Sequence, residues 1–256
     1  MNKYLRGVSN LRERLPLEEC YALLRPLTRR SSIAGKLGHW LVWHLMYSPA
    51  ERRHAAVGPP RLWKVQRDFQ IQFLRRVGLK PQHYLLDLGC GTLRGGIPII
   101  AHLEKGHYFG LEVRAEVVDE ARKELQAAGL VHKNPTLMVI REMASLNLER
   151  KFDYIWSFAV LPHMRDGVLR DAVGFVRRHL GEGGTFYATA NIGNAPERDW
   201  QDGFPSLTRS FESYKEVCSS GGLRIEDLGP LTDLGHPLPK TGRQLARQHM
   251  LKIWKA

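Results

Sequence analysis

The sequence predicts an α/β protein in which a helical N-terminal extension precedes a doubly wound, mostly parallel β-sheet. Three observations lead to this fold class. From residue 84 onward, short apolar segments typical of buried strands alternate with amphipathic segments typical of helices. The first strand segment runs directly into a glycine-rich turn at residues 89–96. A Gly58-Pro59-Pro60 break separates the extension, residues 1–60, from a domain predicted over residues 61–256.

The extension is predicted to be basic and helical, with interruptions. Pro16, Pro26 and Pro49 each end or kink a helical segment. Between them, residues 33–47 carry enough leucine and tryptophan to form an apolar helical face. Such a helix can pack on the domain, cap a pocket as a lid or lie on a membrane surface, and packing is the favoured interpretation.

Positive charge is concentrated in the front of the chain. Residues 1–80 hold 16 of the 38 Lys and Arg residues but 5 of the 26 Asp and Glu residues, which accounts for nearly all of the net charge of +12. An imbalance of this kind steers anionic substrates, nucleic acid or an acidic membrane surface toward a protein. A solvated face that only aids solubility explains the same charge equally well.

Composition excludes several classes of protein. The 256 residues suffice for a full core, and the hydrophobic content of 43% is ordinary for a globular domain. No apolar run approaches the roughly 20 residues that cross a bilayer, and the N-terminal segment lacks the apolar core of a secretory signal, so a cytoplasmic location is expected by default. Cys20, Cys90 and Cys218 are odd in number and far apart, which indicates neither a disulfide framework nor a metal site.

An amphipathic helix is expected first in the domain, because apolar residues recur at helical spacing from Leu62 to Val77 before Gly78. We expect the main strands at residues 84–88, 107–112, 136–140, 152–158 and 184–190. We expect helices at residues 95–103, 115–128 and 167–179. Two weaker strands, at residues 223–228 and 246–254, are expected to complete the sheet at its far edge. Ligands of such sheets bind beyond the carboxyl ends of the strands.

The turn after the first strand has the composition of a cofactor site. Gly89 and Gly91 allow the main chain to turn sharply and to approach a ligand closely, and Cys90 between them is expected to be a small packing residue. A dinucleotide site needs Gly-x-Gly-x-x-Gly, whereas Gly95 lies one residue too far along. The carboxylate of Asp87 is unfavourable beside a pyrophosphate but attracts a sulfonium or an ammonium group. The turn therefore favours a cationic ligand such as S-adenosylmethionine.

Glu112 is the second residue that indicates a nucleoside ligand. It ends the second predicted strand, 21 positions after Gly91. A carboxylate at this place accepts two hydrogen bonds from the vicinal hydroxyls of a ribose. The alternative is a surface acid or a cap for the helix that starts near Ala115. The spacing and the strand context favour ribose recognition.

These residues resemble a known family. The segment L-L-D-L-G-C-G at residues 85–91, with Glu112 at the next strand tip, is similar to motif I and the following acidic position of the class I S-adenosylmethionine-dependent methyltransferases. The resemblance covers residues 62–254. It includes F-D-Y-I-W-S at residues 152–157, similar to the family's fourth strand, and L-G-E-G-G-T-F at residues 180–186, similar to its turn into the fifth strand. It implies a Rossmann-like sheet of seven strands, the last antiparallel, and S-adenosylmethionine as the cofactor.

The resemblance also implies which residues contact the cofactor. In the turn and the next strand tip these are Asp87, Gly89, Cys90, Gly91 and Glu112. Near the ends of the third and fourth strands they are Glu142, which falls close to the family's adenine-contacting acid, Met143, Ser157 and Phe158. The register near residue 142 is open by one residue, so Met143 or Ala144 are alternatives to Glu142 for the adenine contact.

One departure from the family concerns the rim of the pocket. Leu93 replaces the third glycine that is common in this turn, and Arg94 follows it, so the rim is bulkier and more basic than usual. Arg94 is expected to reach the cofactor carboxylate, the substrate or only solvent. By the same resemblance, Trp63 and Gln66 on the first helix are placed to close over the methionine end of the cofactor.

His163 is the main candidate for a catalytic residue. Methyl transfer from a sulfonium mostly requires that donor and acceptor are held in line, and a hydroxyl acceptor also has to lose a proton. His163 follows the fourth strand, and its ordinary pKa suits a general base. An ordinary loop or capping histidine is the competing interpretation. Asp166 and His236 are lesser candidates for the same role.

The methyl acceptor is predicted to be a small molecule, modified at oxygen or nitrogen and anionic if the basic extension serves substrate binding. The stretch after the fourth strand, residues 157–164, lacks the Asn/Asp-Pro-Pro-aromatic signature of methyltransferases that act on nucleic-acid amino groups. An RNA methyltransferase that uses the basic extension is the alternative, since phosphate contacts require charge and no motif. A binding protein that retains the fold without turnover is a second alternative.

Overall fold

The structure is a computed structural model, and it describes residues 63–194, 198–199, 205–237 and 248–256. The predicted extension over residues 1–60, with its apolar helix at residues 33–47, lies outside the described residues. The described domain begins with the predicted amphipathic helix, α5 (Trp63–Arg76), which buries Phe69, Phe73 and Leu74 on one face.

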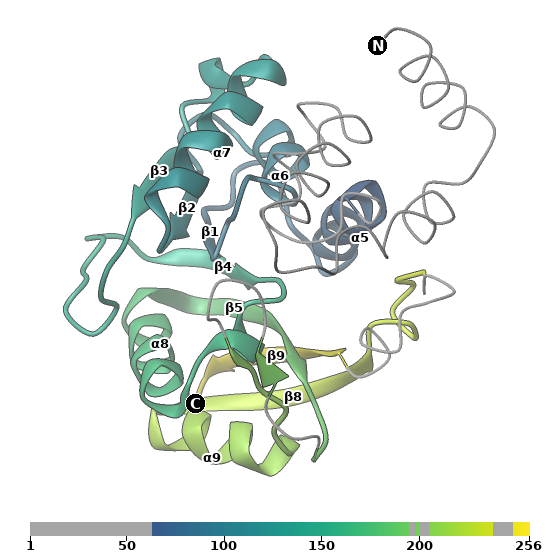
Figure 1. The fold of residues 1–256 in the computed structure, drawn as a ribbon. Coiled ribbons are helices and arrows are strands. Elements are labelled where there is room, and N and C mark those ends of the chain that lie inside the picture. Colours follow the sequence, from purple (N-terminus) through teal and green to yellow (C-terminus); the bar gives the residue numbers. More distant parts are fainter. Residues whose placement is uncertain (1–62, 195–197, 200–204, 238–247) are drawn as a thin grey trace, which may run out of the picture. The chain divides into compact units, whose positions relative to one another are not determined.

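A seven-stranded sheet forms the centre of the domain (Figure 1). Its strands lie in the order β3-β2-β1-β4-β5-β9-β8. Their bounds are β1 (Leu85–Leu88), β2 (Tyr108–Glu112), β3 (Thr136–Val139), β4 (Phe152–Ser157), β5 (Leu180–Asn191), β8 (Leu223–Pro230) and β9 (Gln248–Lys255). The pairs from β3 to β5 are parallel, and β9 runs antiparallel to both β5 and β8. The predicted fold class, with its seven strands and antiparallel last strand, is confirmed.

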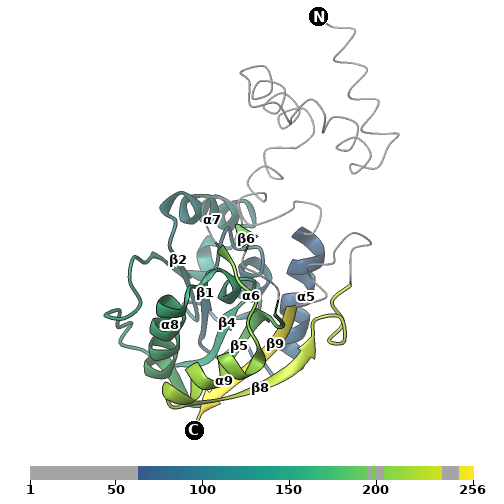
Figure 2. The same cartoon turned by 60° about the horizontal axis from the view of Figure 1, so that its bottom comes forward.

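Helices cover both faces of this sheet (Figure 2). On one face, α8 (Asp166–His179) and α9 (Phe211–Ser220) pack with Leu86, Ile155 and their neighbours in one apolar cluster. On the other face, α5, α6 (Gly96–His102) and α7 (Ala115–Ala127) share a second cluster with Leu85 and Trp156. All four residues of β1 are buried, because this strand lies between β2 and β4 and under both helix layers.

The strand order reverses between β1 and β4, so the chain leaves these two neighbouring strands in different directions. In sheets of this kind, the crevice outside the carboxyl ends at such a reversal is the ligand site. The register places Asp87 of β1 between Gly110 of β2 and Trp156 of β4. We refer below to the region where β1, β2 and β4 end as the carboxyl edge.

Two of the larger elements differ from the prediction. β5 begins at Leu180 rather than at residue 184, because Leu180 pairs with Phe152 before a register shift in β4. α9 was not predicted at all. It begins after Ser210, whose Oγ accepts a hydrogen bond from the backbone N–H of Ser213 at 3.2 Å, and it buries Tyr214 and Cys218.

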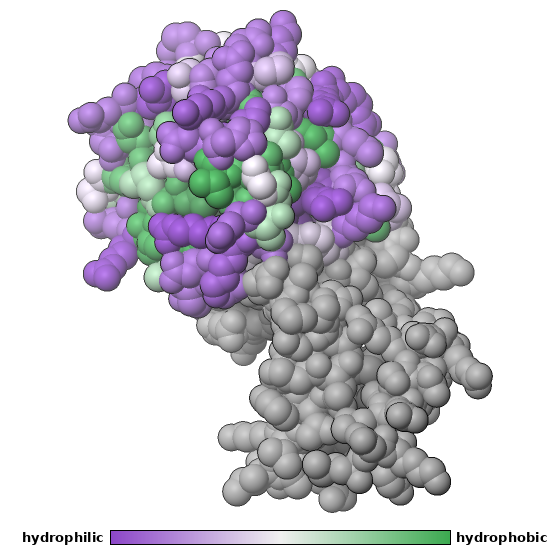
Figure 3. All heavy atoms as spheres, turned by 90° about the horizontal axis from the view of Figure 1, so that it is seen from above, coloured by the Kyte–Doolittle hydropathy of each residue, from purple (hydrophilic) through white to green (hydrophobic). Residues whose placement is uncertain are grey.

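Smaller elements connect these parts. They are the 3₁₀ turns η3 (Val131–Lys133) and η4 (Leu161–His163) and the short pair β6 (Arg198–Asp199) and β7 (Pro205–Ser206). The surface seen in Figure 3 is mainly hydrophilic, with hydrophobic side chains gathered in a band. Among the described residues, no helix is both long enough and apolar enough to span a membrane.

Candidate active site

The glycine-rich turn between β1 and α6 is held in a conformation that side chains rarely allow. Gly89 has φ +82° and Gly91 has φ +55°. An ideal Cβ on Gly89 would lie 2.4 Å from Cγ2 of Val160, which follows β4. The main chain of the turn therefore passes close to the chain that leaves β4. The predicted close approach of this turn to a ligand stays a prediction. Leu93, at the position of the departure from the family, has φ 62° and is fully buried.

Asp87 lies buried beneath this turn. Its side chain is 4% exposed, and its Oδ2 accepts a hydrogen bond from the hydroxyl of Tyr108 at 2.6 Å. Burial raises the pKa of Asp87 to about 7, and the nearby charge of Glu112 acts in the same direction, while the Tyr108 bond and Arg94 oppose the shift. Gly96 makes this contact possible, because a Cβ there would lie 2.6 Å from the Tyr108 hydroxyl. A carboxylate in this setting gains most from a cationic ligand.

Arg94 is the second charged group of the cradle. It is 9% exposed, and its Cζ lies 6.0 Å from the centroid of the Phe158 ring. Burial lowers the pKa of Arg94 to about 10, and the charge of Asp87 opposes that shift, so the guanidinium stays charged at neutral pH. Its burial contradicts the alternative in which Arg94 reaches only solvent. A buried cation close to a buried carboxylate suits a zwitterionic ligand group.

Glu112 ends β2 at the same edge and is 6% exposed. Its Oε1 accepts hydrogen bonds from the backbone N–H groups of Val113 (3.0 Å) and Arg114 (3.3 Å) and from Nε of Arg114 (3.3 Å). These three bonds fix the carboxylate at the strand tip. The sequence alternatives of a surface acid and a helix cap both fit less well, because the side chain is buried and the N-cap residue of α7 is Arg114.

The remaining predicted cofactor residues fall into two groups. Past β3, Met143 is buried while Glu142 and Ala144 are exposed, and Glu142 accepts a hydrogen bond from Ser145 at 2.8 Å. At the other side of the edge, three residues are buried with their side chains engaged in the fold. Ser157 donates to the carbonyl of Leu88 at 3.0 Å, Cys90 donates to the carbonyl of Gly91 at 3.7 Å, and Phe158 stacks on Trp156.

The direction of α5 follows from its contacts with β4. Phe69 packs on Phe158, Phe73 packs on Trp156, and the carbonyl of Val77 accepts a hydrogen bond from Tyr154. The helix therefore runs antiparallel to β4, and its first turns lie beyond Phe158 at the carboxyl edge.

Trp63 and Gln66, both buried, belong to those first turns. Their closure over the methionine end of the cofactor stays a prediction of the resemblance. Gln70, one turn further along, accepts a hydrogen bond from Nε1 of Trp156 at 2.9 Å, a contact that the sequence analysis missed. The spacing of Gln66 and Gln70 on the apolar face of the helix is the signal that could have revealed it.

His163 lies in η4, directly after β4. Its Nδ1 is 2.6 Å from the carbonyl oxygen of Pro205. A carbonyl can only accept, so Nδ1 donates and the neutral ring keeps its lone pair on Nε2. Burial lowers the pKa of His163, the Pro205 bond opposes the shift, and the charge of Arg114 adds to it. The ring is therefore neutral at neutral pH, as a general base requires.

The two lesser candidates lie in different surroundings. Asp166, the first residue of α8, accepts hydrogen bonds from Arg209, which lower its pKa and keep it ionised. His236 is 2% exposed, packs edge-on against Phe69 at 4.8 Å and has its pKa lowered by burial. His236 thus belongs to the carboxyl edge on the α5 side, whereas the side chain of Asp166 is exposed and tied to Arg209.

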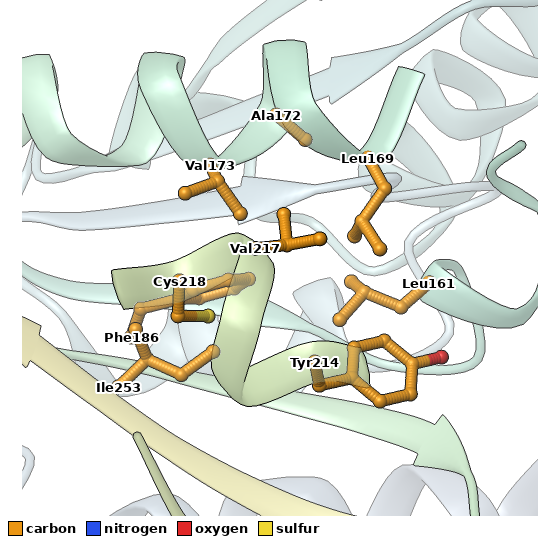
Figure 4. Close-up of a pocket in the computed structure, with 9 residues that line it drawn as sticks. All are labelled: Leu161, Leu169, Ala172, Val173, Phe186, Tyr214, Val217, Cys218 and Ile253. Atoms are coloured by element: carbon orange, nitrogen blue, oxygen red, sulfur yellow. The ribbon is translucent and has the colours of Figure 1, made fainter. Parts of the chain in front are cut away.

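A small hollow lies between α8, α9 and the sheet (Figure 4). Its lining is apolar apart from the Cys218 thiol and the Tyr214 hydroxyl, and it consists of Leu161, Leu169, Ala172, Val173, Phe186, Tyr214, Val217, Cys218 and Ile253. Burial raises the pKa of Cys218 to about 12, so its thiol stays protonated. This hollow, which we call the α8–α9 gap, carries no group suited to acid–base chemistry.

The sequence of the central part of the domain matches a known family model. The model of a family described as "Methyltransferase domain" matches residues 86–186, from β1 to β5. The chain carries a methyltransferase domain. The match and the fold agree with the predicted methyltransferase family and its cofactor. The matched stretch includes Asp87, the glycine turn, Glu112 and His163, whose roles in the site stay predictions. No curated protein sequence matches the chain.

Solved structures agree with this fold. An S-adenosylmethionine-dependent methyltransferase from Clostridium acetobutylicum ATCC 824 is 17% identical with a TM-score of 0.58, over 88% of this chain and all of that one. The glycopeptide N-methyltransferase MtfA, in complex with S-adenosyl-L-homocysteine, is 16% identical with a TM-score of 0.59, over 82% and 98% of the chains. Magnesium protoporphyrin IX methyltransferase (ChlM) from Synechocystis PCC 6803 is 16% identical with a TM-score of 0.56, over 77% and 85%. At these identities the likeness concerns the fold.

The cradle of this methyltransferase fits its cofactor. The Gly89 turn leaves no room for a side chain, Asp87 is a buried carboxylate, and Oγ1 of Thr92 is a buried polar atom with no hydrogen-bond partner among the described residues. A buried polar group without a partner is a free-energy cost that a bound ligand relieves. S-adenosylmethionine supplies the cation, the hydroxyls and the carboxylate that these groups lack.

Proposed function

We propose that this enzyme transfers a methyl group to oxygen or nitrogen of a small molecule bound at the carboxyl edge, with His163 as the proton acceptor. One observation carries the choice of a small molecule. Four side chains at this edge, Gln66, Arg94, Phe158 and His236, are all less than a tenth exposed. An enclosed wall of this kind suits a molecule that is surrounded, whereas a polymer needs an open groove.

The chain's own residues have distinct roles in holding the cofactor. The main chain at Gly89 and Gly91 approaches it, with Cys90 packed between them. Asp87 faces its cationic end, and Arg94 its carboxylate. Glu112 receives the ribose hydroxyls through Oε2, since its bonds to the main chain and to Arg114 use Oε1. Met143, with Glu142 or Ala144, borders the adenine, while Ser157 and Phe158 form the floor at the end of β4.

The bound cofactor supplies an electrophilic methyl group on a sulfonium, so the protein mainly aligns the acceptor and excludes water. His163 adds the removal of a proton. Its Nδ1 bond to Pro205 fixes the tautomer and the direction of Nε2, and its lowered pKa keeps the ring neutral. The names of two structural neighbours support a small acceptor, because MtfA is a glycopeptide N-methyltransferase and ChlM acts on magnesium protoporphyrin IX.

The experiment combines binding with group transfer. Calorimetry with S-adenosylmethionine and S-adenosylhomocysteine tests the cofactor site. Transfer of labelled methyl from S-adenosylmethionine is then followed into a small-metabolite extract and into total RNA, with the same enzyme. Label in the metabolite fraction supports the proposal, and label in RNA that falls steeply with salt identifies the alternative RNA methyltransferase. Binding without transfer to either fraction identifies the non-catalytic alternative.

His163 is tested separately. His163→Asn retains a donor toward Pro205 and removes the basic nitrogen, so we expect turnover to fall by about 10²–10³-fold at pH 7, with a smaller loss at high pH where the acceptor ionises by itself. Unchanged turnover assigns His163 to a structural role. An anionic acceptor stays a prediction, because the positive charge that suggested it lies mostly outside the residues that the structure describes. The cytoplasmic location also stays a prediction.

A further inference from the structure

One buried imidazole at the carboxyl edge has no chemical role in the proposed function. His236 follows β8, and its Nδ1 lies 3.0 Å from the carbonyl oxygen of Pro237, so Nδ1 donates and Nε2 is the acceptor. Nε2 is buried and has no hydrogen-bond partner among the described residues. Leaving such an atom unpaired is a cost that a ligand group relieves. The missing partner has to be a hydrogen-bond donor.

Two aromatic rings pack against the His236 ring. Phe69 meets the His236 ring edge-on at 4.8 Å, and Phe158 lies nearly parallel to it, with centroids 6.4 Å apart and an angle of 16°. Phe69 and Phe158 also contact each other at 6.0 Å. Gln66 lies one turn before Phe69 on α5, and its Oε1 is likewise buried without a partner among the described residues. The surroundings therefore combine flat apolar walls with two polar atoms.

Arg94 relates this group to the cofactor cradle. Its guanidinium lies over Phe158, opposes the raised pKa of Asp87 and contributes to the lowered pKa of His236. Arg94 thus lies near both Asp87 of the cradle and the aromatic group around His236. Because Phe158 directly follows β4, the His236 ring lies beside the strand end where the methyl group is transferred.

We propose that His236, Phe69, Phe158 and Gln66 form the acceptor subsite of this enzyme, and that its occupant is a planar aromatic molecule bearing an O–H or N–H group. This inference rests on the proposed function and adds the substrate class. The aromatic walls select a flat ring through stacking and edge contacts. Nε2 of His236 accepts a hydrogen bond from the O–H or N–H group and thereby orients the bound molecule. The O–H or N–H group held in this way can face the methyl group of the cofactor, with His163 on the side of η4.

The test uses the full chain saturated with S-adenosylhomocysteine, so that the cofactor site is filled. Saturation-transfer NMR is recorded with catechol, cyclohexane-1,2-diol and 1,2-dimethoxybenzene. Catechol has both the flat ring and the donors, the diol lacks the ring, and the dimethoxy compound lacks the donors. We expect signal transfer to catechol alone. Equal transfer to all three, or none to catechol, overturns the inference.

Variants assign the binding to His236. His236→Leu should weaken catechol binding by about tenfold, the usual effect of losing one buried hydrogen bond. His236→Gln restores an acceptor near the position of Nε2 and should recover part of the loss. His132→Gln, at an exposed histidine in η3, is the matched control.

Unchanged S-adenosylhomocysteine affinity shows that each variant is folded. Catechol binding that survives His236→Leu overturns the inference and leaves the proposed function standing. Failure of the wild-type chain to bind S-adenosylhomocysteine overturns the proposed function itself.

Discussion

The carboxyl edge and the α8–α9 gap both lie against the same sheet, yet they bury opposite kinds of side chain. The edge encloses Asp87, Arg94, Glu112 and His236, each less than a tenth exposed. The α8–α9 gap is a small hollow that is lined almost wholly by aliphatic and aromatic groups (Figure 4). Burial of charge lowers stability unless a partner is present, whereas burial of apolar area raises it.

This difference assigns the two regions to different tasks. Apolar packing against α8 and α9 supplies stability that does not depend on a ligand. The edge holds charged and unpaired groups whose partners are the cofactor and the acceptor, so its cost is offset only when they bind. Substitutions at the edge should therefore change binding and pH dependence, and substitutions in the gap should change stability alone.

The largest effect is expected from the carboxyl group of Asp87 in the protein without cofactor. Folding raises its pKa from 3.8 to about 7, so the protonated form is favoured in the folded state. The contribution of the protonated Asp87 carboxyl to the free energy of unfolding is complete below about pH 4 and is lost as the pH rises to about 7. The loss amounts to up to about 4 kcal/mol. Asp87→Asn stays neutral, so the variant should gain free energy of unfolding relative to wild type across this range, measured by urea unfolding.

The same variant should bind S-adenosylmethionine more weakly, because the cation loses its carboxylate. Histidines with lowered pKa values are present in both proteins and cancel in the difference between them. Asp171→Asn, at an exposed position on α8, is the control. A difference between Asp87→Asn and wild type that stays constant from pH 4 to pH 8 would contradict a buried, cofactor-directed carboxylate.

Glu112 is expected to give the next largest effect. Glu112→Ala removes an acceptor of two ribose hydrogen bonds, and affinity for S-adenosylhomocysteine should fall about a hundredfold, or about 3 kcal/mol. Calorimetry measures this loss, and the far-ultraviolet circular dichroism should stay unchanged. Glu116→Ala, an exposed acid in the first turn of α7, is the matched control. Affinity equal to that of the control would remove the ribose assignment.

Much of the edge could be predicted from sequence because the information is local. Asp87, Gly89 and Gly91 lie within five residues, and the turn conformation follows from the glycines themselves. Glu112 could be placed because a strand end is recognisable from its apolar residues. The alternating pattern also predicted the sheet, since both faces of each parallel strand are covered.

The rest depends on contacts between segments far apart in the chain. Nothing near Arg94 shows that it is buried, because its surroundings come from Asp87 and from Phe158 after β4. His236 owes its setting to Phe69, which lies 167 positions earlier. α9 was missed for a different reason. It is short and carries few apolar residues, and packing of Tyr214 and Cys218 against α8 stabilises it.

The smallest of the three effects is expected in the α8–α9 gap. Leu169→Ala removes a side chain that is 3% exposed and lines the hollow. Because one side of Leu169 already faces empty space, the loss should lie at the low end for such a change, about 2 kcal/mol in free energy of unfolding. Leu169→Met, of similar volume, should cost less than about 1.5 kcal/mol. Affinity of the folded variant for S-adenosylhomocysteine should equal that of wild type by calorimetry. A large loss of affinity would show that the gap and the edge are coupled, and the division of tasks between them would then fail.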